Sequence, residues 1–289
     1  MPVVGFNKRV FAIAGAALFA ASILSAHRVA SQPAPKKPPE QAYEPTEYQS
    51  GKDVVWLPTA QGLVDKMLDM AKVTKDDTVM DLGSGDGRTV ITAAKRGATA
   101  IGIEYNPDMV ELSRKNAAKE GVSDKATFMK ADIFETDFSK ATVITLFLLP
   151  DLNVRLRPKI LAMKPGTRVV SNSFDMGDWL PEQTAEAPAG CTRYCKAYLW
   201  IVPERVEGKW KTADGGTIEF KQKYQTVAGN IANGNVVAAI KQGKINHDKI
   251  GFTAGDGAEY SAKITGDVME GTVKTKDGEK PFKAERVKG

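Results

Sequence analysis

The 289-residue sequence contains very little histidine or cysteine. Its two histidines are His27 and His247, near opposite ends of the chain, and its two cysteines are Cys191 and Cys195. A zinc site made of these residue types needs three or four ligands, so it would have to gather residues from across the whole sequence. A Ser-His-Asp triad would depend on His247. Both kinds of site are disfavoured, no metal is expected, and chemistry that needs neither imidazole nor thiolate remains.

The sequence also lacks a concentrated run of one charge. The formal net charge is +5 and the isoelectric point about 9.0, but the lysines are spread along the chain. This distribution is typical of a solvated basic surface, so nucleic acid is not the expected partner. With 42% hydrophobic residues, a chain of this length can form one or two globular domains.

The N-terminus lacks an apolar run of full membrane-spanning length. Lys8 and Arg9 precede an uncharged run over residues 10–24. As a helix this run measures roughly 22 Å, less than the roughly 30 Å of a bilayer core. Residues 1–31 are therefore predicted to be a signal peptide, and residues 32–48 a Pro/Lys-rich linker. We expect export to the periplasm with no stable transmembrane span after cleavage. The alternative is an uncleaved signal that anchors the protein in the inner membrane.

Cys191 and Cys195 do not settle the compartment. A disulfide between them requires a tight turn, because an extended segment of this length holds their Cα atoms too far apart. Two free thiols is the favoured interpretation, and the disulfide is the alternative.

Residues 49–204 are predicted to form one α/β domain. Apolar runs of strand length alternate with segments that have helical spacing of their apolar residues. This alternation predicts a parallel, doubly wound sheet whose ligand lies beyond the carboxyl ends of the strands. The expected strands are residues 77–82, 98–104, 126–130, 141–149 and 168–174, with residues 194–202 added to the same sheet.

A glycine-rich loop follows the first expected strand and precedes a helix. Gly83 and Gly85 let the backbone turn sharply and allow a ligand to lie directly against it, with Ser84 between them. Asp81 ends the strand and faces this loop. A carboxylate at that position does not help a pyrophosphate to bind, whereas it favours a ligand that carries an ammonium group and a sulfonium.

Two further acids follow the next two strands. Glu104 can accept hydrogen bonds from both hydroxyls of a ribose, and the adjacent Tyr105 offers an aromatic face to an adenine. Asp132, followed by Ile133, can accept a hydrogen bond from an adenine amino group. Any one of these acids could be an ordinary loop carboxylate. Their placement after three successive strands, together with the glycine loop, favours a nucleoside site.

The segments 79–88, 102–107 and 131–134 resemble the successive S-adenosylmethionine (SAM) motifs of class I methyltransferases. Segments 146–150 and 56–59 narrow the resemblance to bacterial proteins similar to the family of the ATP-synthase c-subunit lysine methyltransferase. The resemblance covers about residues 43–181 and implies a Rossmann-like fold with SAM as cofactor. It also implies SAM contacts for Asp81, Gly83, Gly85, Glu104 and Asp132, and places Thr59 near the methionine moiety.

The acceptor site is expected at the end of the strand that includes residues 145–150. Leu149 and Pro150 would form its floor, with Asn153 as a nearby polar contact. Phe147 stands where relatives usually carry tyrosine, so no role that needs a hydroxyl is expected at this position. No general base is evident. Catalysis would then depend on alignment and on fixed dipoles around the sulfonium.

Residues 205–289 have a different pattern, with short alternating segments separated by Asp-Gly and Asn-Gly turns. This predicts a small all-β meander domain, either a barrel or a sandwich, in which His247 is a surface residue. The domain shows no catalytic constellation, and a binding or docking role is our hypothesis for it.

The favoured function is a SAM-dependent methyltransferase whose acceptor is unidentified, with a protein lysine as one candidate. An exported SAM-binding or scaffold protein that has lost turnover is the alternative. A nicotinamide oxidoreductase is a third hypothesis, against which Asp81 and the missing catalytic histidine count.

Overall fold

The computed structural model describes residues 43–255 and 257–288. The predicted signal peptide, and residues 32–42 of the predicted linker, lie outside the described residues. In the described ranges, no helix combines the length and apolar character needed to cross a bilayer.

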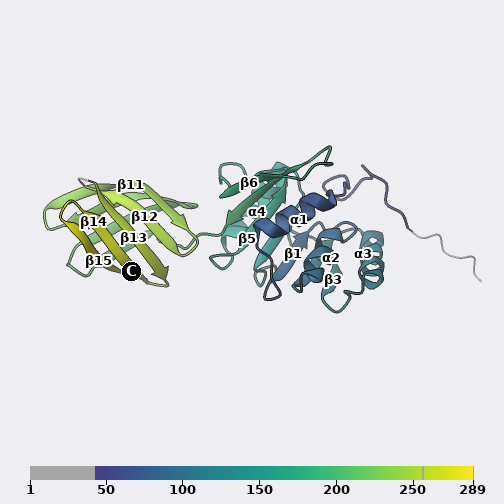
Figure 1. Cartoon of the computed structure of the whole chain (residues 1–289), viewed down its shortest axis with the longest axis horizontal. Coiled ribbons are helices and arrows are strands. Elements are labelled where there is room, and N and C mark those ends of the chain that lie inside the picture. The colour runs from purple at the N-terminus through teal and green to yellow at the C-terminus, as the bar shows by residue number, and fades with distance from the viewer. Residues whose placement is uncertain (1–42, 256, 289) are drawn as a thin grey trace, which may run out of the picture. The chain divides into compact units, whose positions relative to one another are not determined.

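A seven-stranded sheet organises the first part, in the order β3-β2-β1-β4-β5-β7-β6 (Figure 1). The five strands from β3 to β5 are mutually parallel, whereas β7 runs antiparallel to both of its neighbours. Their bounds are β1 Thr78–Leu82, β2 Thr99–Glu104, β3 Ala126–Lys130, β4 Val143–Leu146, β5 Arg168–Asn172, β6 Gln183–Glu186 and β7 Lys196–Ile201.

The sheet is therefore mixed, and the expectation of a wholly parallel sheet was wrong at this edge. Residues 173–195, all of them described, contain no helix to provide the crossover that a parallel connection needs, so the chain returns through β6 instead. The strand β6 was missed because Gln183–Glu186 is short and mostly exposed and lacks apolar alternation. The strand expected at residues 141–149 is also shorter, because residues 147–149 leave the sheet before Pro150 begins a helix.

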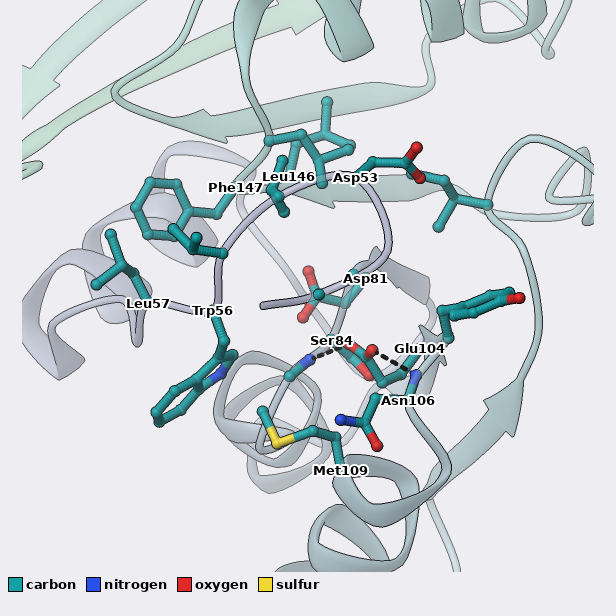
Figure 2. Close-up of a pocket in the computed structure, with 18 of the residues that line it drawn as sticks. Asp53, Trp56, Leu57, Asp81, Ser84, Glu104, Asn106, Met109, Leu146 and Phe147 are labelled. Carbon is teal, nitrogen blue, oxygen red and sulfur yellow. Dashed lines mark hydrogen bonds between the residues drawn. The ribbon is translucent and has the colours of Figure 1, made fainter. Parts of the chain in front are cut away.

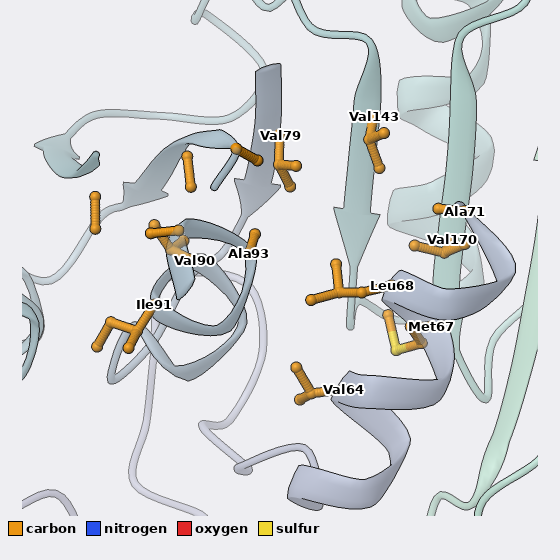
Figure 3. Packing of buried hydrophobic residues seen from close by; sticks show 14 of the residues in the cluster. Val64, Met67, Leu68, Ala71, Val79, Val90, Ile91, Ala93, Val143 and Val170 are labelled. Atoms are coloured by element: carbon orange, nitrogen blue, oxygen red, sulfur yellow. The ribbon is translucent and has the colours of Figure 1, made fainter. Parts of the chain in front are cut away.

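Helices cover both faces of the sheet. The helices α1 (Gln61–Met70), α2 (Arg88–Lys95) and α3 (Pro107–Lys119) contribute to one buried cluster. Figure 3 shows α1 side chains such as Leu68 facing Val143 and Val170 of the sheet, with Ala93 of α2 nearer to Val79. The helix α4 (Pro150–Leu161) packs in a second cluster on the other face. This two-sided cover confirms a Rossmann-like doubly wound core.

Local sequence explains where two of these helices begin. Gly87 precedes α2 with φ of 84°, and a Cβ there would lie 2.9 Å from Phe128 and Ser113 side-chain atoms. Glycine is thus required for both its conformation and its close packing. The side chain of Asn106 accepts a hydrogen bond from the backbone N–H of Asp108 at 2.9 Å, which caps α3. Both starts face the carboxyl ends of the parallel strands.

The remaining strands form a closed antiparallel barrel. Each strand pairs with the next along the chain, and β15 pairs with β8 to close the ring. The prediction of an all-β C-terminal region is confirmed, but its strands close into a barrel, one of the two predicted forms, and are not strictly a meander. The strands are β8 Gly208–Thr212, β9 Thr217–Lys223, β10 Thr226–Asn233, β11 Val236–Asn246, β12 Lys249–Ala254, β13 Ala258–Thr265, β14 Val268–Thr275 and β15 Gly278–Arg286.

His247 lies exposed in the turn before β12, as predicted. The domain boundary at residue 205 stays a prediction.

On the face of the sheet that α4 covers, Trp200 is the side chain that we expect to contribute most to the stability of the fold. It is fully buried, its indole N–H donates to the carbonyl of Trp179 at 2.6 Å, and the two rings lie 6.2 Å apart. Trp200→Ala should lower the free energy of unfolding by about 3–5 kcal/mol, because it leaves a large cavity and an unpaired carbonyl. Denaturant titration of the full chain followed by circular dichroism measures this. Leu180→Ala, at a side chain that is 68% exposed, is the control and should change stability by less than about 0.5 kcal/mol. A similar small effect for Trp200→Ala would contradict the argument.

Candidate active site

A pocket of about 400 Å³ lies at the carboxyl ends of the parallel strands. The structure brings together there every residue that the sequence suggested for the cofactor, and two of the four suggested for the acceptor. These are Thr59, Asp81, Gly83, Ser84, Gly85, Glu104, Tyr105, Asp132, Ile133, Phe147 and Leu149.

Asp81 lies near the middle of the pocket, between Phe147 and Glu104 as seen in Figure 2. Its side chain is buried, and the hydroxyl of Thr145 on β4 donates to its Oδ1 at 2.5 Å. Burial raises the pKa of this carboxyl to about 7, opposed by the Thr145 hydrogen bond and assisted by the negative charges of Glu104 and Asp86. A buried acid of this kind gains most from a ligand that brings a positive charge to it.

Glu104 ties the glycine loop to the second strand. Its carboxylate accepts the backbone N–H of Gly85 at 3.0 Å and that of Asn106 at 2.9 Å, the two bonds drawn in Figure 2. These bonds fix the carboxylate while it lines the pocket, where it remains able to accept from the hydroxyls of a bound ribose.

The glycine loop itself is shaped for a ligand that lies against the backbone. Gly83 and Gly85 have φ of 86° and 54°, and a Cβ at Gly85 would lie 2.6 Å from the Trp56 indole nitrogen. The hydroxyl of Ser84 is buried and has no hydrogen-bond partner among the described residues. A buried hydroxyl without a partner is costly, so a polar group of a ligand has a site here. The loop, Ser84, Asp81 and Glu104 together fit a cationic nucleoside such as SAM.

Asp132 lines the same pocket, but both of its oxygens already have donors. Its Oδ1 accepts the backbone N–H of Phe134 at 2.8 Å, and its Oδ2 pairs with the ammonium of Lys52. The hydrogen bond from Lys52 is the main cause that lowers the pKa of Asp132. A contact from Asp132 to adenine stays a prediction, and it requires Lys52 to share or release Oδ2.

Lys52 belongs to a hairpin that covers the pocket and that the sequence did not indicate. Tyr48 and Trp56 are joined by a backbone hydrogen bond of 2.9 Å, and residues 49–59 all line the pocket. The ammonium of Lys52 also lies 5.2 Å from the centre of the Tyr105 ring. The hairpin thus closes the side of the pocket where an adenine is expected. It has no strong periodicity, and only the resemblance at residues 56–59 could have pointed to it.

Pro150 and Asn153 do not line the pocket. Pro150 is exposed at the first turn of α4, where its missing N–H costs nothing. Asn153 is fully buried and donates to the carbonyls of Phe174 at 3.3 Å and Asp175 at 3.0 Å. Asn153 therefore shapes the pocket by holding the turn after β5, whereas the sequence suggested a direct contact with the acceptor.

Cys191 and Cys195 form a disulfide with a Cα–Cα distance of 5.7 Å, which corrects the favoured interpretation of two free thiols. The chain makes the required turn at Tyr194, whose φ is 56°. Tyr194 also lines the pocket, together with Phe174 after β5. Only their positions next to strand ends could have pointed to these two rings in the sequence.

Comparisons with known proteins agree with this geometry. A family model described as the ANTKMT methyltransferase domain matches residues 81–183. A protein-lysine N-methyltransferase of Saccharolobus islandicus is 42% identical over 154 residues, which are 52% of this chain and 95% of that protein. The human ATP synthase c-subunit lysine N-methyltransferase is 34% identical over 44% of this chain, but the match spans only 54% of the human protein.

A solved structure of an RNA methyltransferase from Salinibacter ruber with S-adenosyl-L-homocysteine is 47% identical. It covers 52% of this chain and 96% of its own, with a TM-score of 0.49.

The pocket and the relatives define the class: a SAM-dependent methyltransferase with SAM as its cofactor. Within this class, the chain belongs to the same family as the Saccharolobus protein and is related to the ATP synthase c-subunit lysine methyltransferases.

The raised pKa of Asp81 predicts that SAM binding depends on pH. Only the ionised carboxylate attracts the ligand's cation, so binding should be strong at pH 8 and about tenfold weaker at pH 6, on the two sides of a pKa of about 7. Calorimetric titration of the full chain with SAM measures this. Asp81→Asn should bind more weakly overall and lose this part of the pH dependence, which separates Asp81 from titration of SAM itself.

Asp76→Asn is the matched control for this experiment, because Asp76 pairs with Lys75 outside the pocket and should keep the wild-type pH profile. An unchanged profile in Asp81→Asn would show that Asp81 does not carry the effect.

Proposed function

We propose that the enzyme transfers a methyl group from SAM to a lysine side chain of a protein. The observation that carries this proposal is the division of the pocket on either side of Asp81. Acidic residues line it over β1, β2 and β3, whereas Phe147, Leu149 and Phe174 line it over β4 and β5. An apolar half suits the aliphatic stem of a lysine better than a charged or strongly hydrated acceptor. The names of the Saccharolobus and human relatives support the same acceptor class.

When bound, SAM would supply an electrophilic methyl group to an amine nitrogen of the acceptor, and the electron pair of the broken C–S bond would stay on sulfur. The positive charge passes to the nitrogen, whose extra proton leaves to water. The protein's residues prepare this step. Asp81 binds cationic parts of the cofactor, Glu104 and the glycine loop orient the nucleoside, and the hairpin at residues 48–56 excludes water. None of the described residues that line the pocket is histidine or cysteine, and we expect the acceptor amine to lose its proton to water before it attacks.

A proteome extract incubated with the full chain and SAM labelled in its methyl group tests the acceptor. One sample keeps its lysines free and the other has them chemically acetylated. Label should enter protein in the first sample and fall to background in the second, because acetylation removes the nucleophilic amine. Mass spectrometry of labelled peptides should locate methyl-lysine.

Asp81→Ala is the control, and it should reduce labelling of the sample with free lysines strongly. Label that survives acetylation, or that enters RNA, would overturn the lysine assignment. Label in neither sample, from a protein that still binds SAM, would favour the scaffold alternative.

The export predicted from residues 1–31 stays a proposal, with an uncleaved inner-membrane anchor as its alternative. It is supported by the Cys191–Cys195 disulfide, since disulfides persist in oxidising compartments. A reporter that is active only in the periplasm, fused after Gln49, should be active if the proposal holds. The same fusion lacking residues 1–31 is the control and should be inactive. Activity without these residues would rule out the signal.

A further inference from the structure

Three aromatic rings line one end of the pocket and pack against one another. Phe147 and Tyr194 meet edge to face with ring centres 5.4 Å apart, and Phe174 lies 6.1 Å from Phe147 and 5.8 Å from Tyr194. All three line the pocket, and Tyr194 is 40% exposed. An exposed tyrosine packed against two half-buried phenylalanines is an unusual wall for a site that has only to exclude water.

The topology places these rings at the acceptor end. Phe147 follows β4, Phe174 follows β5 and Tyr194 precedes β7, so all three lie at adjacent strand ends on one side of β1. The acidic residues Glu104 and Asp132 lie at strand ends on the other side. A nucleoside held by the acidic side therefore leaves the aromatic side for the second substrate.

Tyr194 is held in place by the loop that carries it. Cys191 and Cys195 close this loop by their disulfide, and the backbone N–H of Ala187 donates to the carbonyl of Cys195 at 2.6 Å. Arg193 ties the same loop to the hairpin, because its guanidinium donates to the Tyr48 hydroxyl. The positive φ of Tyr194 costs a non-glycine residue free energy, so without the cross-link the turn would relax toward other conformations.

We infer that Phe147, Phe174 and Tyr194 form a cation-binding enclosure for the acceptor's amino group, and that the Cys191–Cys195 disulfide keeps Tyr194 in position as its third wall. The ligand class is an alkylammonium, including its methylated forms. Ring faces attract a cation through their quadrupole, and methylated ammonium groups suit aromatic walls because they are weakly hydrated. The inference rests on the proposed function, in which an amine is the acceptor.

This enclosure acts on the charge that appears during transfer. The acceptor nitrogen is neutral when it attacks and becomes positive as it gains the methyl group, so the rings stabilise the transition state more than the neutral amine. Disruption of the enclosure should therefore lower turnover and weaken binding of the methylated product, with no change in cofactor affinity.

The test uses two short peptides that differ in one side chain, titrated into the full chain saturated with S-adenosylhomocysteine. One carries trimethyl-lysine, and the other carries the uncharged tert-butyl analogue of the same shape. The wild-type protein should bind the trimethyl-lysine peptide about five- to tenfold more tightly. Equal binding of the two peptides would overturn the cation assignment.

Most of this preference should be lost in two variants, Tyr194→Ala and the double variant Cys191→Ser/Cys195→Ser. Both should bind S-adenosylhomocysteine within about twofold of wild type, and this affinity would show that they are folded. Tyr194→Phe keeps the ring and should retain the preference, and Leu180→Ala, outside the pocket, is the neutral control. Full preference in Tyr194→Ala would overturn the enclosure, and full preference in the double serine variant would overturn the role of the disulfide.

These outcomes are separable from those of the proposed function. Methylation of protein lysines with no effect of Tyr194→Ala on product binding would leave the proposed function standing and remove the enclosure. A charge-selective enclosure in a protein that methylates no lysine would do the reverse and point to another alkylamine as acceptor.

Discussion

The parallel pairing of β1 with β2 on one side and β4 on the other is the constraint on which the active site depends. Asp81 pairs in register with Gly102 and with Thr145, so one buried carboxylate lies between two strands of different character. On one side of β1, strand β2 ends in Glu104. On the other side, strand β4 ends next to Phe147. Because parallel strands end at a common edge, this single register brings a polar and an aromatic region into one pocket.

The Thr145 hydroxyl makes that arrangement tolerable for the fold. A buried carboxylate without a donor would be costly, and the hydrogen bond from β4 removes part of the cost while leaving the pKa raised. The protein thus keeps a carboxylate that is poorly solvated in the free enzyme and better satisfied when a cation is present. Some stability of the free protein is given up in favour of ligand affinity, a pattern common at functional sites.

Much of the cofactor half could be predicted from the sequence, because its residues follow strands with strong apolar patterns. Asp81, Glu104 and Asp132 each end or directly follow such a strand, so the fold rule alone brings them together. The parts that were missed depend on contacts between distant segments. The hairpin near Lys52 and the ring of Tyr194 come from segments without periodicity. The antiparallel pair β6–β7 is preceded by no helical pattern, so no signal in the sequence indicated it. Asn153 was expected to contact the acceptor, but its amide points instead to the turn at Phe174.

The walls of the pocket are drawn from residue 49 to residue 194, nearly the whole span of the sheet domain. The cofactor and the acceptor together would touch both extremes of this span, so the complete site can form only after the last strand has docked against the others. Occupancy therefore reports completed folding, and mass action adds the ligand's binding free energy to the stability of every element between those extremes. In a compartment where the cofactor is scarce, the same linkage would leave the domain more open to proteases, and its lifetime would follow the supply of its own cofactor.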